Sequence, residues 1–121
     1  MSSIYSDALE KLLHQAHPKI FSDHLIIFKN CFGAVAGYVD GRIFVSYGKF
    51  GVALRLPPEV LAELLKEVGV SRLRYFPKGH VKKEYAVLPR RILIDRGRFG
   101  KLVDESIDFV LSTPPPSTSP Q

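Results

Sequence analysis

The chain has 121 residues, of which 45% are hydrophobic and 24% charged. This length gives room for one domain with its own core, and the composition is ordinary for a globular protein. No apolar run approaches the roughly 20 residues that cross a bilayer, so we expect no membrane-spanning segment. The first residues lack the basic and apolar parts of a secretory signal, and a single cysteine, Cys31, cannot form an internal disulfide. We therefore expect a cytoplasmic protein.

The net charge of +5 is unevenly distributed along the chain. Residues 72–101 hold ten basic and two acidic residues, a net charge of +8, which leaves −3 for the rest of the chain. Such a concentration of positive charge attracts anionic partners, including nucleic acid, although a solvated basic face that only aids solubility has the same composition.

The first half of the chain predicts a helix followed by an antiparallel meander. Residues 3–17 carry apolar side chains at a spacing of three and four, which predicts an amphipathic helix that ends at Pro18. The apolar run 25–28 is ambiguous and is either a strand or the edge of one. Three further runs, 34–39, 42–47 and 52–56, are separated by Asp40-Gly41 and by a glycine cluster, which predicts tight hairpins.

The second half predicts a helix, two strands and a last helix. The pair Pro57-Pro58 begins a helix whose apolar stripe includes Val68, and Gly69 closes it in left-handed geometry. Strands are expected at 72–76 and 84–88, and a final amphipathic helix begins near Arg98. Residues 1–112 thus form one α+β domain, and the proline- and serine-rich segment 113–121 is expected to be a disordered tail.

The order of these elements, together with several short motifs, resembles the N-terminal domain of the TfoX/Sxy competence regulators. The motifs are Phe32-Gly33, Asp40-Gly41-Arg42-Ile43-Phe44, Leu54-Arg55-Leu56-Pro57 and Tyr85-Ala86-Val87-Leu88-Pro89. The chain departs from that family at Cys31, where methionine is common, and in having no tryptophan. Residues 77–111 are also similar to MmcQ/YjbR-like proteins.

The resemblance implies a two-layer sandwich, in which an antiparallel sheet carries helices on one face. The implied order is helix, three strands, helix, two strands, helix. It also implies a role in competence or transcription regulation. The longer regulators carry a second, C-terminal domain, which we do not expect in this chain.

The strongest candidate site is the basic segment with its interleaved aromatic rings. Its cations can neutralise phosphates and its rings can stack on bases, unless the rings face the core. We predict a nucleic-acid-binding site at Arg72, Arg74, Lys78, Lys82, Lys83, Arg90 and Arg91.

No residue set specifies a reaction, a metal or a cofactor. His14 and His17 share a helix side without a ligand set, and Cys31 lacks a neighbouring base, so surface and filler roles are favoured. The carboxylates Asp104, Glu105 and Asp108 lie opposite an apolar stripe, where side chains are usually solvated. We expect no enzyme and no cofactor.

Two hypotheses of function remain open. The first is a small regulatory protein of the TfoX N-terminal type whose basic face binds an anionic partner such as nucleic acid. The alternative is a protein-protein interaction module, a homodimer or an adaptor, that uses an exposed sheet edge or face. Salt-dependent binding separates the two.

Overall fold

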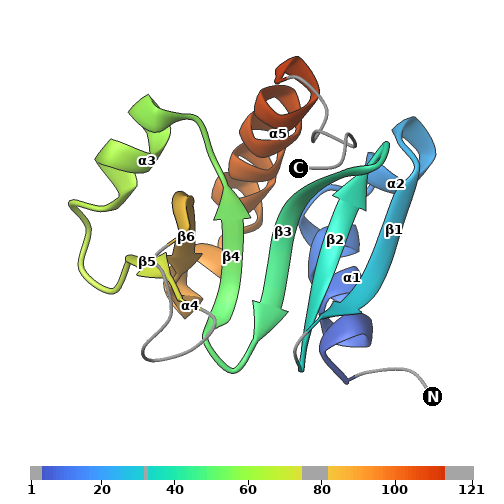
Figure 1. The fold of residues 1–121 in the computed structure, drawn as a ribbon, viewed down its shortest axis with the longest axis horizontal. Helices are drawn as coiled ribbons and strands as arrows, with labels where there is room; N and C mark the ends of the chain where they lie inside the picture. The colour runs from blue at the N-terminus through green and yellow to red at the C-terminus, as the bar shows by residue number, and fades with distance from the viewer. Residues whose placement is uncertain (1–3, 32, 75–81, 114–121) are drawn as a thin grey trace, which may run out of the picture.

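A computed structural model describes residues 4–31, 33–74 and 82–113, with only the backbone for Cys31 and Lys82. Within these residues the chain forms an α+β fold of five helices and six strands (Figure 1). In chain order the elements are α1 (Ile4–Ala16), α2 (Ile20–Asp23), β1 (Ile26–Cys31), β2 (Ala34–Val39), β3 (Arg42–Gly48), β4 (Gly51–Arg55), α3 (Pro58–Leu64), β5 (Ser71–Leu73), β6 (Lys82–Leu88), α4 (Arg90–Leu93) and α5 (Arg96–Ser112).

The six strands form one open sheet in the order β1-β2-β3-β4-β6-β5, and every neighbouring pair is antiparallel. The predicted meander is confirmed as β2, β3 and β4. Its first turn places Asp40 at a φ of 48° and Gly41 at a φ of 86°, the left-handed geometry that a two-residue hairpin requires. The sequence order is broken only at β6, which lies between β4 and β5.

The core lies between the sheet and the helices α1 and α5, which are drawn behind the strands in Figure 1. Its most deeply buried side chains come from α1, α5 and alternate positions of the central strands, and they include Leu9, Leu13, Val45, Leu54, Phe99, Val103 and Val110. A bulge between β2 and β3 adds Phe44 to this core. The buried hydroxyl of Ser106 on α5 donates to the Phe44 carbonyl at 3.2 Å, which ties the helix to the sheet.

The two long helices approach each other closely near the end of α1. A Cβ atom added to Gly100 of α5 would lie 2.4 Å from the carbonyl oxygen of Ala16. Any side chain at position 100 would therefore meet the backbone of α1, and glycine is what allows the two helices to contact.

The structure corrects several details of the predicted elements. Two single-turn helices, α2 and α4, are absent from the prediction, since four residues are too few to show a helical period. The apolar run 25–28, for which the sequence left two possibilities open, lies mostly within a strand, β1. Helix α3 ends at Leu64, so Val68 lies beyond it and is 87% exposed, although Gly69 has the predicted positive φ of 86°. The predicted tail lies, from residue 114 onward, outside the described residues.

Candidate nucleic-acid interface

Three residues of the predicted site lie on or next to β5 and β6, which pair with each other at one end of the sheet. Leu73 is fully buried against Ala53 and Tyr85 in a small second cluster. Because successive side chains of an extended chain point to opposite sides, burial of Leu73 directs its neighbours Arg72 and Arg74 away from that cluster, and both are exposed. Lys83 of β6 is also exposed. We call Arg72, Arg74 and Lys83 the basic edge, because β5 is the last strand of the sheet.

Arg72 is held in place by the neighbouring strand. Its guanidinium donates a hydrogen bond to the Lys83 carbonyl at 3.1 Å. The bond crosses a register shift between Arg72 and Leu73, where the ladder is irregular. This hydrogen bond orients one side of the Arg72 guanidinium, which has five N–H donors in all.

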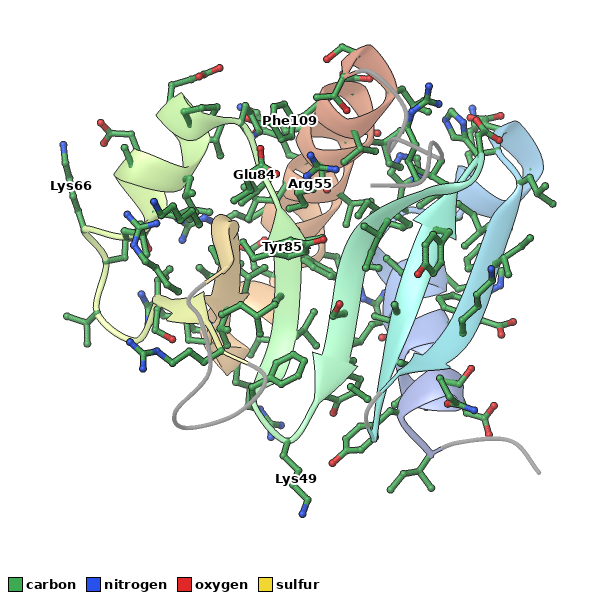
Figure 2. All side chains as sticks on the ribbon, viewed as in Figure 1. Lys49, Arg55, Lys66, Glu84, Tyr85 and Phe109 are labelled. Carbon is green, nitrogen blue, oxygen red and sulfur yellow. The ribbon has the colours of Figure 1, made fainter. Side chains whose placement is uncertain are left out.

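The one acidic residue within β6 is engaged elsewhere. Glu84 lies 2.8 Å from Arg55, and the Arg55 guanidinium lies over the Phe109 ring at 5.5 Å from its centroid. Figure 2 shows Glu84, Arg55 and Phe109 together beside α5. Glu84 therefore neutralises Arg55 and leaves the charge of the adjacent Lys83 in place.

The arginines of α4 follow the C-terminal end of β6, whereas Lys83 lies near the start of that strand. Arg91 lies 3.3 Å from Glu67, which also forms an ion pair with Arg98 of α5. Hydrogen bonding to Arg98 is the main cause that lowers the pKa of Glu67, and Arg91 contributes in the same direction. Arg91 is thus partly neutralised, whereas Arg90 is exposed. Lys78 lies outside the described residues, and for Lys82 only the backbone is described.

The one described aromatic ring of the predicted site, that of Tyr85, is not exposed for stacking. Tyr85 is 9% exposed and packs with Leu73 and Ala53, so its ring belongs to the interior and is not free to stack on a base. Tyr75 and Phe76 lie outside the described residues. At the described part of the site, the available chemistry is charge and hydrogen bonding rather than stacking.

The lowered pKa of Glu67 predicts a stability that depends on pH. A carboxylate whose pKa falls on folding stabilises the fold above its ordinary value of 4.5, and this contribution is lost as pH falls through the folded-state pKa. We expect Glu67→Gln to flatten the acid limb of the melting temperature measured against pH, because glutamine does not titrate. An unchanged acid limb in this variant would show that Glu67 is not coupled to folding.

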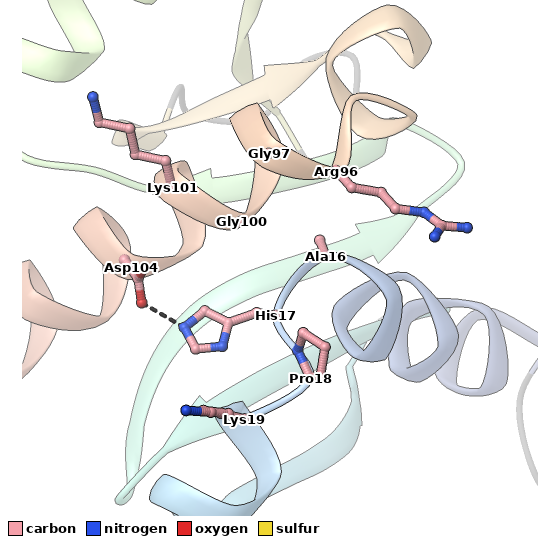
Figure 3. Close-up of a pocket in the computed structure, with 9 residues that line it drawn as sticks. All are labelled: Ala16, His17, Pro18, Lys19, Arg96, Gly97, Gly100, Lys101 and Asp104. Carbon is pink, nitrogen blue, oxygen red and sulfur yellow. Dashed lines mark hydrogen bonds and ion pairs between the residues drawn. The ribbon is translucent and has the colours of Figure 1, made fainter.

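Sequence inspection missed a second group of polar residues between α1 and α5. A hollow of about 470 Å³ is lined by small residues and by His17, Lys19, Arg96, Lys101 and Asp104. Nε2 of His17 lies 2.5 Å from the Asp104 carboxylate, although the two residues are 87 apart in sequence. In Figure 3 the charged ends of Arg96 and Lys101 point in different directions, away from the hollow. The His17–Asp104 pair joins the end of α1 to α5.

Comparisons with known proteins add no relative. No family model matches the chain, and no curated protein or solved structure matches it. None of the described helices has both the length and the apolar character to cross a membrane. Among the described residues, no three His, Cys, Asp or Glu side chains are grouped as a metal site would require.

Proposed function

We propose that the chain is a non-enzymatic regulatory protein of the TfoX N-terminal type that binds an anionic partner, with nucleic acid as the first candidate, at its basic edge. Its architecture would be the two-layer sandwich of that family, with helices on one face of the sheet. It would act in the cytoplasm, in the control of competence or transcription.

The observation that carries this proposal is that Arg72, Arg74 and Lys83 are all exposed on or next to β5 and β6, the last two strands of the sheet. Arg72 belongs to β5, Arg74 follows that strand and Lys83 belongs to β6, and the Arg72 guanidinium is held by the Lys83 carbonyl at 3.1 Å. A guanidinium that is already oriented loses less side-chain entropy when it binds a phosphate oxygen. Cations on an extended edge can follow a phosphate backbone, which contributes affinity without selecting a base sequence.

The proposal ranks three of the seven predicted residues. Arg72 and Lys83 are expected to contribute most, since Glu84, next to Lys83 in sequence, is paired with Arg55. Arg91 is expected to contribute less, because Glu67 neutralises part of its charge and binding a phosphate would compete with that ion pair.

The test is fluorescence anisotropy of a labelled random duplex and a labelled single strand, titrated with protein at several salt concentrations. We expect a steep loss of affinity with salt, with the double variant Arg72→Ala/Lys83→Ala weakening duplex binding about tenfold or more at low salt. Its log–log salt slope should fall by about 0.9 for each phosphate that the variant no longer neutralises. Arg91→Ala should reduce affinity less than either single change at the basic edge.

The matched control is Lys11→Ala/Lys101→Ala, which removes the same charge from α1 and α5 behind the sheet (Figure 1). If both double variants weaken binding equally, only net charge matters and the basic edge is not a site. Absence of binding at low salt would remove nucleic acid as the partner.

A protein-protein interaction module is the second candidate. The observation that favours it is the opposite edge of the sheet, where β1 is the terminal strand and Leu25 and Ile27 are 63% and 42% exposed.

A further inference from the structure

The outer edge of β1 has backbone groups that no described strand pairs. Leu25, just before β1, accepts a hydrogen bond from the Asp40 N–H at 2.9 Å, and its own N–H donates to the Asp40 carboxylate at 3.2 Å. Leu25 thus directs its backbone groups toward β2. Because these groups alternate along an antiparallel strand, those of Ile26 and Phe28 point outward. The edge is therefore able to accept another strand.

The side chains beside this edge form a row that is complementary to itself. Leu25, Ile27 and Lys29 alternate with the outward-pointing backbone positions and share one face of the sheet. Asp23 ends α2 one residue before the chain becomes extended at His24. This row is apolar at Leu25 and Ile27 and basic at Lys29, and the acidic Asp23 precedes it at the end of α2; Asp23 and Lys29 are both exposed.

We infer that β1 pairs with β1 of a second copy of this chain, antiparallel and with Ile26 at the two-fold axis. This register places Leu25 of one protomer beside Ile27 of its partner and brings the end of α2, which carries Asp23, toward Lys29 of the partner, and each contact occurs twice. It also places the outward backbone groups of the two Ile26 residues opposite each other. The two-fold axis produces both opposite-charge pairs and both apolar pairs at once. A second copy therefore fits this edge better than an unrelated strand.

Neighbouring residues extend the apolar part of the contact. Ile27 lies opposite Tyr38 on β2, which lies opposite Ile43 on β3, so three side chains form a row across the strands. Lys29 lies over the Tyr38 ring at 5.2 Å from its centroid. A lysine on a sheet edge normally prevents pairing, since two would repel, but here the register supplies Asp23 of the partner as its counter-charge.

This interface deepens the second candidate function and does not depend on nucleic-acid binding, because the basic edge lies at the other end of the sheet. A dimer through β1 carries one basic edge at each end of a continuous sheet. Variants at β1 should therefore abolish dimerisation, and variants at the basic edge should abolish nucleic-acid binding, so the two losses can be told apart.

The test is sedimentation velocity over a range of protein concentrations, using charge reversal. We expect the wild type to dimerise and each single variant, Asp23→Lys or Lys29→Asp, to weaken the dimer about tenfold or more, because each places two like-charged pairs across the two-fold axis. Mixing the two single variants should restore association, since every pair across the mixed dimer is again opposite in charge. The double variant Asp23→Lys/Lys29→Asp should also dimerise.

The matched controls are Lys11→Asp and Asp108→Lys, which reverse the same charges on exposed positions of α1 and α5. They should leave the dimer unchanged. Ile27→Ser removes the apolar pair and should weaken the dimer irrespective of salt, whereas the charge-reversal effect should shrink at high salt. A wild type that stays monomeric at the highest concentration overturns the inference, as do single variants that fail to associate when they are mixed.

Discussion

Replacing Gly100 with alanine is expected to lower the free energy of unfolding by about 1–3 kcal/mol, the range for overpacking a tight contact. Within a helix, alanine is normally favoured over glycine by about 1 kcal/mol, so the loss of stability expected here is opposite in sign to the effect of helix propensity. The reason is the Ala16 carbonyl oxygen, 2.4 Å from the position that the new methyl group would occupy. A backbone oxygen cannot rotate away as a flexible side chain can, so α1 and α5 must separate. Urea denaturation gives the free energy.

Gly97, one turn earlier in the same helix, is the matched control. A Cβ atom there would lie 3.8 Å from its nearest neighbour, a carboxylate oxygen of Asp95, which is an ordinary contact. Gly97→Ala should therefore stabilise the protein by about 0.5–1 kcal/mol through helix propensity alone. Equal and stabilising effects at both positions would show that α1 and α5 do not approach as closely as described.

The second large effect is expected at Phe99, which is fully buried in the core. Phe99→Ala should cost about 3–5 kcal/mol, because it removes a large apolar side chain and leaves a cavity between α5 and the sheet. If the variant is too unstable to measure, Phe99→Leu keeps most of the volume and should lose a smaller amount. Chemical denaturation of both variants gives the comparison.

Phe21 serves as the control for Phe99. It is only partly buried, stacks on His14 with ring centroids 4.1 Å apart and contacts Phe28 at the margin of the core. Phe21→Ala should therefore cost clearly less than Phe99→Ala. A loss at Phe21 equal to that at Phe99 would contradict the assignment of the core to the space between α5 and the sheet.

The parts of the fold that the sequence predicts well are those set by neighbouring residues. Asp40-Gly41 specifies its hairpin because only a few residues accept a positive φ. The final helix, predicted near Arg98, begins at Arg96, after Asp95, whose carboxylate accepts a hydrogen bond from the Arg98 N–H. Its apolar stripe is buried as expected. These features need no information from the rest of the chain.

The parts that the sequence does not predict depend on residues that are far apart. Nothing local indicates that β6 lies between β4 and β5, because either order satisfies the same alternation of apolar residues. The candidate site shows the same limit. The composition identifies a basic segment, but the pairing of Arg91 with Glu67 joins residues 24 apart in sequence and cannot be inferred from charge counts.

The position of β6 also has a consequence for synthesis of the chain. Strand β4 is complete at Arg55, but the strand that covers its second side does not begin until Lys82. While the ribosome makes the residues between them, the meander that has already emerged has an open edge at β4 as well as at β1. Both edges can pair with another nascent copy, and only the one at β4 is closed by the chain itself. The interval before residue 82 is thus the period in which this protein is most exposed to misassembly.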